Sequence, residues 1–283
     1  MFTWNCKGKF LSLEPPLVMG IMNVNPDSFY EGSRFESPDA IRAAAVRMAG
    51  EGADILDVGG QSTRPDSARI DAAEELQRVL PVVKMLAETM NDAVLISVDT
   101  YHSSVALACL EAGASMVNDI SAGEMDPGMI PSLGKRNVPY VCMHMKGVPE
   151  TMQQDARYDD VVTEVLDFLI KKTAQCRLAG IRDVIVDPGF GFGKNARHNF
   201  ELLRRLSEFK ILDQPLMVGL SRKSTIYRTL GITAAEALNG TTVLHTLALL
   251  NGADILRVHD VKEARQVIRL MDAFRESASG LPG

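Results

Sequence analysis

Eight short apolar segments, each followed by a longer stretch with apolar residues at helical spacing, alternate along almost the whole chain. This alternation restricts the possible folds most, because strands that alternate with helices form parallel sheets. The expected strands are residues 17–22, 54–58, 94–98, 115–117, 138–143, 183–186, 215–218 and 254–258. Eight such units in about 260 residues predict an α/β fold of the (β/α)8 TIM-barrel type. A doubly wound open sheet is the alternative, but it seldom contains eight consecutive units.

The length of the chain fits one domain of this kind. It has 283 residues, and a (β/α)8 barrel typically has about 250. We expect a short N-terminal arm at residues 1–16, a single barrel domain at 17–276 and a disordered tail at 277–283. Apolar residues make up 46% of the chain and charged residues 23%, which is enough apolar surface for a large core.

Charge and cysteine usage exclude several classes of protein. The formal net charge is −6 and the basic residues are dispersed, which argues against binding to nucleic acid or to a membrane surface. The four cysteines lack the CxxC spacing of a zinc site, so we expect free thiols. The N-terminus does not resemble a signal peptide, and no apolar run approaches the roughly 18 residues of a membrane span. We therefore expect a cytoplasmic protein.

The segment from Asp187 to Lys194 predicts a ligand-binding loop. It begins with a carboxylate at the end of an expected strand, which is where barrel enzymes place their substrate contacts. Its alternate glycines allow tight turns close to a ligand, and Phe190 and Phe192 provide flat apolar surfaces. A purely structural turn is the alternative for one such loop alone. The spacing matches neither the dinucleotide-binding nor the P-loop pattern.

Polar groups follow every expected strand. They are Asn23, the loop 61–64, Asp99, Asn118, His144, Asp187, the loop 221–223, and Arg257 with His259. In a closed barrel, these positions converge on one face and would line one pocket. A polar residue that merely ends a strand is common, so it is the combination of eight that indicates a site.

The chemistry of these groups is of two kinds. Asp99, Asn118 and Asp187 offer hydrogen-bond acceptors that suit a flat heterocycle with several N–H donors. The cationic or potentially cationic groups suit phosphate or carboxylate, and they are Arg64, Lys223, Arg257 and His259. Asn23 offers an oxygen of the type that Mg²⁺ prefers. The residues therefore predict a phosphorylated heterocyclic substrate.

Eight segments resemble, in the same order, the motifs of the dihydropteroate synthase family. The first is similar to the NxTPDSF signature of that family. The segments are residues 20–29, 57–65, 97–100, 117–120, 143–145, 187–194, 221–224 and 257–260. The resemblance extends over about residues 17–275, and the combination is far more specific than any single motif.

This resemblance implies a barrel enzyme of folate biosynthesis, commonly a homodimer and the target of sulfonamide drugs. Such a transferase condenses 6-hydroxymethyl-7,8-dihydropterin pyrophosphate with 4-aminobenzoate to give 7,8-dihydropteroate and pyrophosphate. Because an aromatic amine is a weak nucleophile, we expect pyrophosphate to depart before the amine attacks. Catalysis would then consist mainly of stabilising the leaving group and orienting the amine, with Mg²⁺ as cofactor.

The resemblance also implies roles for individual residues. The pterin would contact Asp99, Asn118, Met143, Asp187, Gly219, Lys223 and Arg257. The aminobenzoate would contact Thr63, Arg64, Pro65, Phe192, Lys223 and Ser224. The pyrophosphate would contact Asn23, Thr63, Arg257 and His259, and Asn23 would also bind the metal. The residues implied to be catalytic are Asp187, Lys223, Arg257 and His259.

Three positions depart from the usual family pattern. Asn25 replaces a Thr, Gln61 replaces a frequent Glu, and Glu31 replaces an Asp. All three lie in expected loops, so they affect the expected loop closure and rate more than the pterin pocket. Two rival functions remain at this point, a methyltetrahydrofolate-dependent corrinoid methyltransferase and a non-catalytic pterin-binding paralogue. The loops implied to bind aminobenzoate and anions argue against the first.

Overall fold

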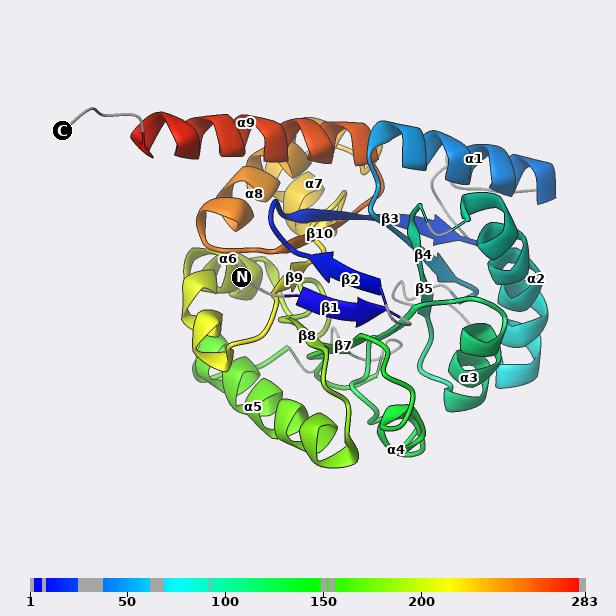
Figure 1. Cartoon of the computed structure of the whole chain (residues 1–283). Coiled ribbons are helices and arrows are strands. Elements are labelled where there is room, and N and C mark those ends of the chain that lie inside the picture. Colours follow the sequence, from blue (N-terminus) through cyan, green and yellow to red (C-terminus); the bar gives the residue numbers. More distant parts are fainter. Residues whose placement is uncertain are drawn as a thin grey trace.

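The computed structural model describes residues 3–6, 9–24, 38–61, 69–91, 93–148, 152 and 156–279, and it shows a (β/α)8 barrel (Figure 1). The barrel strands are β3 (Leu17–Asn23), β4 (Ile55–Gly59), β5 (Leu95–Asp99), β6 (Met116–Asp119), β7 (Tyr140–Met143), β8 (Val184–Asp187), β9 (Met217–Val218) and β10 (Ile255–Val258). All neighbours pair in parallel, in the order β8-β7-β6-β5-β4-β3-β10-β9. A parallel bridge between Val186 and Leu216 joins the two ends of this sheet. The predicted fold class is confirmed.

Helices follow the strands and surround the barrel (Figure 1). They are α1 (Pro38–Glu51), α2 (Ala72–Met90), α3 (Ser103–Glu111), α4 (Met129–Leu133), α5 (Val161–Ala179), α6 (Ala196–Arg204), α7 (Ser224–Leu230), α8 (Leu238–Leu250) and α9 (Val261–Ser279). A 3-10 helix, η2 (Leu206–Leu212), follows α6. We did not expect α7 and η2 from the sequence, because each has only 7 residues and thus too few turns for a clear apolar period. Helix α9 also continues past Glu276, where we expected the ordered chain to end.

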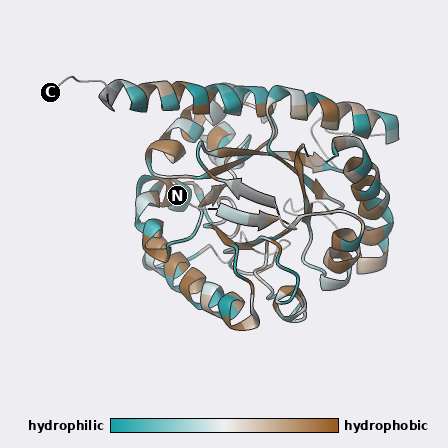
Figure 2. Cartoon of the chain, viewed as in Figure 1, coloured by the Kyte–Doolittle hydropathy of each residue, from teal (hydrophilic) through white to brown (hydrophobic). Residues whose placement is uncertain are grey.

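The interior of the barrel is apolar at one end and polar at the other. Side chains alternate across each strand, so Ile55 and Asp57 of β4 both point inward, one layer apart. The layers of side chains near the amino ends of the strands are filled by apolar residues, which are Met19, Ile55, Met116, Ile185 and Ile255. Figure 2 shows hydrophobic residues in the barrel strands and mixed faces on the surrounding helices. The polar layer that begins at Asp57 is therefore the floor of a site at the carboxyl ends of the strands.

An antiparallel hairpin covers the apolar end of the barrel. It consists of β1 (Thr3–Cys6) and β2 (Lys9–Ser12), which lie across the amino ends of the barrel strands in Figure 1. Trp4 is only 2% exposed and packs in the same cluster as Met19 and Ile255. The hairpin therefore closes the end of the barrel opposite to the polar layer.

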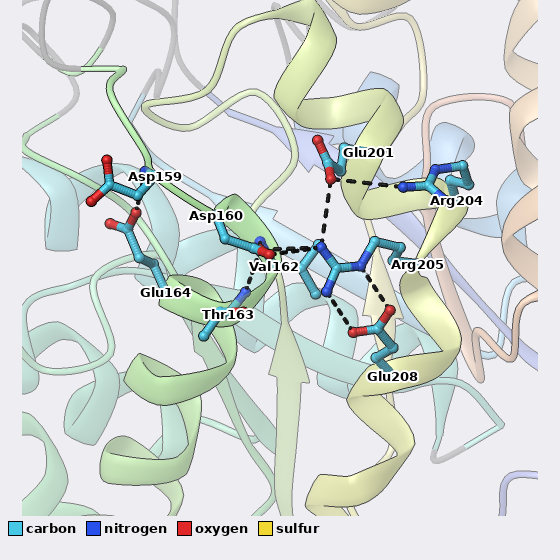
Figure 3. Close-up of polar contacts among 9 residues, drawn as sticks. All are labelled: Asp159, Asp160, Val162, Thr163, Glu164, Glu201, Arg204, Arg205 and Glu208. Carbon is cyan, nitrogen blue, oxygen red and sulfur yellow. Dashed lines mark hydrogen bonds and ion pairs between the residues drawn. The ribbon is translucent and has the colours of Figure 1, made fainter.

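A charged cluster ties α5 to the segment that follows α6 (Figure 3). Asp160 caps α5 by accepting hydrogen bonds from the backbone N–H groups of Val162 and Thr163. Arg205 binds the same carboxylate, with Nη1 3.0 Å from Asp160 Oδ2, and its Nε lies 2.7 Å from Glu208 Oε1. These contacts hold together the two helices that flank β8, the strand that carries Asp187.

The sequence also led to expectations about the cysteines and about membrane-spanning segments. All four cysteines are buried free thiols, as the scattered spacing predicts. Within the part of the chain that the structure describes, no helix has both the length and the apolar character needed to cross a membrane.

Candidate active site

The predicted site residues that the structure describes lie at the carboxyl ends of the barrel strands. Asn23, Asp99, Asn118, Met143 and Asp187 lie in the last two residues of β3, β5, β6, β7 and β8. Gly219 and Lys223 follow β9, Arg257 lies near the end of β10, and His259 follows β10. Thr63, Arg64 and Pro65 lie outside the described residues, as do Asn25 and Glu31. The fold therefore gathers on one face groups that are up to 236 residues apart, from Asn23 to His259.

Three of these side chains each offer one unoccupied oxygen. Asp99 accepts from Arg257 through Oδ2 at 2.6 Å, and Asp187 accepts from the N–H of Gly189 through Oδ1 at 2.7 Å. Asn118 donates its Nδ2 to Asp57 Oδ2 at 2.9 Å. The second oxygen of Asp99 and of Asp187, and the Oδ1 of Asn118, accept no hydrogen bond within the described residues. Three strands thus present acceptors for a ligand that carries several donors.

Burial shifts the protonation of the two site carboxylates. It raises the pKa of Asp99 to about 7; the Arg257 guanidinium opposes this rise, while Asp57, Glu75 and Asp119 add to it. Burial also raises the pKa of Asp187, against the opposing effect of Lys223. Both groups therefore hold their charge less readily than an exposed carboxylate, and a bound ligand that donates hydrogen bonds would favour the charged form.

Arg257 lies between two carboxylates. Its Nε donates to Asp57 Oδ2 at 2.7 Å and its Nη2 donates to Asp99 Oδ2 at 2.6 Å. Asp57 is fully buried and belongs to the site, a role that was not predicted from the sequence. The period-two alternation of Ile55, Asp57 and Gly59 in β4 would have placed this carboxylate inside the barrel.

Lys223 joins the loop after β9 to the Asp187 loop. Its Nζ donates to the backbone carbonyl of Phe190 and lies 4.8 Å from the centre of the Phe192 ring. Burial lowers the pKa of Lys223 to about 8, with Asp187 opposing and Arg257 adding to the shift. The ammonium group is thus held against an aromatic face, which is a favourable cation–π arrangement.

The Asp187 loop is organised around a buried lysine. Lys194 is 2% exposed, and its Nζ donates to the carbonyls of Gly189 and Phe192, both at 3.0 Å. The same Nζ lies 2.9 Å from His144 Nδ1, and burial lowers the pKa of His144 to about 2, so the ring is neutral. Gly189 has φ +71°, and a Cβ there would lie 1.9 Å from the His144 carbonyl oxygen. His144 therefore supports the loop, although the sequence suggested only that it lies in the ring of polar strand ends.

The loops after β9 and β10 are joined to each other. His259 Nδ1 lies 3.1 Å from Ser221 Oγ, which also accepts from the His259 backbone N–H at 3.2 Å. Arg222 binds both oxygens of Asp260, each at 2.9 Å. Lys223 and His259 are each adjacent to one member of this ion pair, so the pair fixes their relative positions. Ser224 begins α7 beside them.

One oxygen of the site is suited to a metal bound with its substrate. Within the described residues there is no group of three or more His, Cys, Asp or Glu that could hold an ion. Asn23 is half-buried at the end of β3 and pairs in register with Gly59. A Cβ at Gly59 would lie 3.7 Å from Asn23 Oδ1 and 3.5 Å from Asp99 Cβ, so the glycine leaves the space between these residues open. The expected Mg²⁺ would thus have one protein oxygen here.

Comparisons with known proteins agree with this geometry. The profile of the family described as "Pterin binding enzyme" matches residues 19–259. The chain is 44% identical to the dihydropteroate synthase of Escherichia coli K12 over 94% of both chains. It is similar, with a TM-score of 0.93 and 40% identity, to the Yersinia pestis dihydropteroate synthase solved with a sulfonamide drug, covering 97% of this chain and 100% of that one. The Xanthomonas albilineans enzyme in complex with 7,8-dihydropteroate has a TM-score of 0.85 and 37% identity, covering 99% and 100%.

Proposed function

The chain belongs to the pterin-binding enzymes and, among them, to the dihydropteroate synthase family, and on that premise we propose how its residues act. It is a transferase of folate biosynthesis. We propose that it condenses 6-hydroxymethyl-7,8-dihydropterin pyrophosphate with 4-aminobenzoate, releasing 7,8-dihydropteroate and pyrophosphate. The observation that supports this most is the set of three free oxygens, from Asp99, Asn118 and Asp187, beside the cations Lys223 and Arg257.

The pterin ring lies against the acceptor side of the site. Its amino and ring N–H groups donate to the free oxygens of Asp99, Asn118 and Asp187, and it packs on Met143 beside Gly219. Met143 is 3% exposed and belongs to an apolar cluster with Tyr101 and Ile120 at this end of the barrel. Lys223 and Arg257 lie at the ring edge or face. Charged acceptors in a buried site bind donors more strongly than they would in water.

Pyrophosphate binds at the cationic side of the site. Arg257 and His259 contact it, together with Asn23 and with Thr63, which lies outside the described residues. Asn23 fits a magnesium ion because Mg²⁺ usually keeps several waters and takes only one or two protein oxygens plus substrate phosphates. When bound, the ion would neutralise charge on the leaving group.

The second substrate, 4-aminobenzoate, lies beside the Asp187 loop. Phe192 packs on its ring, and Lys223 and Ser224 border it, together with three residues of the loop outside the described part, which are Thr63, Arg64 and Pro65. Lys223 Nζ lies against the Phe192 ring. The ammonium group can therefore pair with the carboxylate of 4-aminobenzoate while Phe192 packs on its aromatic ring.

The reaction begins with the departure of pyrophosphate, because the aromatic amine is a weak nucleophile. The C–O bond to pyrophosphate breaks first, and both bonding electrons leave with the oxygen. Positive charge on the methylene carbon is then delocalised into the pterin, where the Asp187 carboxylate stabilises it. Arg257 and His259 stabilise the departing anion, and the bound amine attacks the carbon and loses a proton.

The order of these steps is tested by positional isotope exchange. Substrate with ¹⁸O in the bridging position between methylene and phosphorus is incubated with the enzyme, and the remaining substrate is analysed by mass spectrometry and ³¹P NMR. Early departure predicts that label moves to non-bridging positions before product forms. Product formation with the label fixed in the bridge of the remaining substrate would contradict that order.

We propose in addition that the protein acts in the cytoplasm as a homodimer. Exposed apolar residues lie on the neighbouring helices α7, α8 and α9, and they are Leu230, Val243, Leu247, Leu250, Leu270 and Phe274. An apolar patch of this kind favours burial between two copies of the chain. Sedimentation velocity is expected to show a dimer that Leu247→Glu dissociates; a dimer unaffected by this charge would exclude the α8 face.

A further inference from the structure

A single buried carboxylate joins two of the residues that face the pterin. Asp57 has no exposed surface, and it lies on β4, one layer below the ends of the strands. Its Oδ2 accepts both from Asn118 Nδ2, on β6, at 2.9 Å and from Arg257 Nε, on β10, at 2.7 Å. Three strands that are distant in sequence are therefore connected through one oxygen atom.

This connection determines which end of the Asn118 amide faces the ligand. An asparagine side chain can present either its oxygen or its NH₂ group, which have nearly the same shape. The Oδ2 of Asp57 accepts from Arg257 Nε, and arginine can only donate, so Asn118 has to turn its NH₂ group towards this oxygen. The Asn118 oxygen is thereby directed away from Asp57, and it accepts no hydrogen bond within the described residues.

We propose that Asp57 is a positioning residue that determines specificity, because it fixes Asn118 as an acceptor and orients Arg257 through Nε. This proposal rests on the proposed function for the identity of the ligand. With Asn118 fixed, three strands all present acceptors to the heterocycle, from Asp99, Asn118 and Asp187. It therefore selects a heterocycle with an amino group at the recognised edge, as in pterin, over the same heterocycle with an oxo group there.

Asp57 is needed to fix Asn118 because the two ends of the Asn118 amide have nearly the same shape. Without an acceptor-only partner, Asn118 could rotate and offer its NH₂ group to an oxo group of the ligand. An amide in place of the Asp57 carboxylate would keep its oxygen on Arg257 Nε and Asn118 Nδ2, so it would preserve the constraint. A leucine has nearly the same shape and no acceptor, so it removes the constraint. A carboxylate in place of the Asn118 amide can only accept, so it restores an acceptor beside the introduced leucine.

The test is isothermal titration calorimetry with two ligands, pterin and its 2-oxo counterpart lumazine, in the presence of pyrophosphate. The wild-type protein is expected to prefer pterin. In Asp57→Leu, the ratio of the two affinities is expected to fall at least about tenfold, the size of one hydrogen-bond mismatch. In Asp57→Leu with Asn118→Asp, we expect the ratio to return to within about threefold of wild type. Asn118→Asp alone is expected to bind pterin at least about tenfold more weakly, because two carboxylates then face each other.

The control is Asp119→Asn, next to Asn118 on β6 but on the outer side of the barrel. Asp119 is also fully buried and accepts from Tyr140 Oη at 2.8 Å and from Ser121 Oγ at 2.7 Å. This variant is expected to be less stable and to keep the wild-type ratio. An unchanged ratio in Asp57→Leu, no recovery in the double variant, or wild-type pterin binding by Asn118→Asp would contradict the positioning role of Asp57 and leave the proposed function intact. A wild-type protein that binds neither ligand would contradict the proposed function as well.

Discussion

Asp187 shows at the scale of one residue how a strand end becomes a binding group. One of its oxygens accepts from the N–H of Gly189 at 2.7 Å, which fixes the carboxylate, and the other accepts nothing within the described residues. The sequence alone predicted Asp187, Asp99 and Asn118 as acceptors because each follows a buried apolar run. The sequence could not show that Arg257 pairs with Asp99 and Asp57, because these contacts depend on the register of distant strands. Arg257 and Asp57 are 200 residues apart in the sequence.

The first prediction concerns Asp187→Asn. The amide can still accept from Gly189, but it then turns an NH₂ group towards the donors of the pterin and carries no charge to stabilise the cation. Steady-state assays are expected to show a fall in turnover of at least about 100-fold, as is typical for loss of one electrostatic contact in a transition state. We expect no loss of stability, because burial already disfavours the charged form.

Asp183→Asn, before the opposite end of β8, is the control and is expected to retain turnover. Near-normal activity of Asp187→Asn would contradict the role of Asp187 in both binding and catalysis.

The second prediction concerns the pH dependence of kcat/KM for the pterin substrate. Asp99 has a pKa raised to about 7 and Lys223 a pKa lowered to about 8. Protonation of Asp99 below pH 7 removes a charged acceptor, and deprotonation of Lys223 above pH 8 removes a cation. A bell-shaped profile with its maximum between these values is therefore expected, falling about tenfold per pH unit outside them. Asp99→Asn is expected to lose the acid limb; a flat wild-type profile from pH 6 to pH 9 would contradict both assignments.

At the scale of elements, α2 contains an acid that destabilises the fold when charged. Glu75 is 1% exposed and accepts from Thr100 Oγ1 at 2.6 Å, and its Oε1 has no partner among the residues that the structure describes. Burial raises the pKa of Glu75 from 4.5 to about 7, against the opposing effects of Thr100 and Arg78. Because the folded state binds this proton more tightly, its stabilising effect is complete below about pH 4.5 and is lost as the pH rises through 7.

The third prediction follows from that shift. Glu75→Gln keeps an acceptor for Thr100 and cannot ionise, so its advantage over wild type should grow by about 2–3 kcal/mol between pH 5 and pH 8. Urea unfolding at the two pH values measures this difference. Glu74→Gln, one residue earlier with its side chain 50% exposed, is the control and is expected to show no such pH dependence. An equal stability difference at both pH values would show that Glu75 does not titrate in this range.

Elements with strong patterns could be predicted and short ones could not. All eight strands coincide with apolar segments of the sequence, and each lies within two residues of its expected boundaries. Helix α7 was missed because its 7 residues begin directly at the loop residue Ser224, without a side-chain cap at Lys223. The role of Lys194 was missed because a lysine in a sequence looks solvent-exposed, whereas here backbone carbonyls surround it.

The whole molecule combines an apolar end, closed by the β1–β2 hairpin, with a polar end that forms the site. The alternation of strands and helices predicts this architecture, and the convergence of the strand ends follows from closure of the barrel. In the proposed function, three oxygens from three strands bind one heterocycle, with Lys223 and Arg257 beside it, and Arg257 also binds the charged leaving group.

The most direct test is a product assay with the purified protein. Dihydropterin pyrophosphate and Mg²⁺ are supplied with and without 4-aminobenzoate, and both released pyrophosphate and the pterin product are measured by mass spectrometry. We expect 7,8-dihydropteroate and equimolar pyrophosphate only when 4-aminobenzoate is present. Tight binding of the pterin without any condensation product would contradict the proposed function and would make the chain a non-catalytic pterin-binding paralogue.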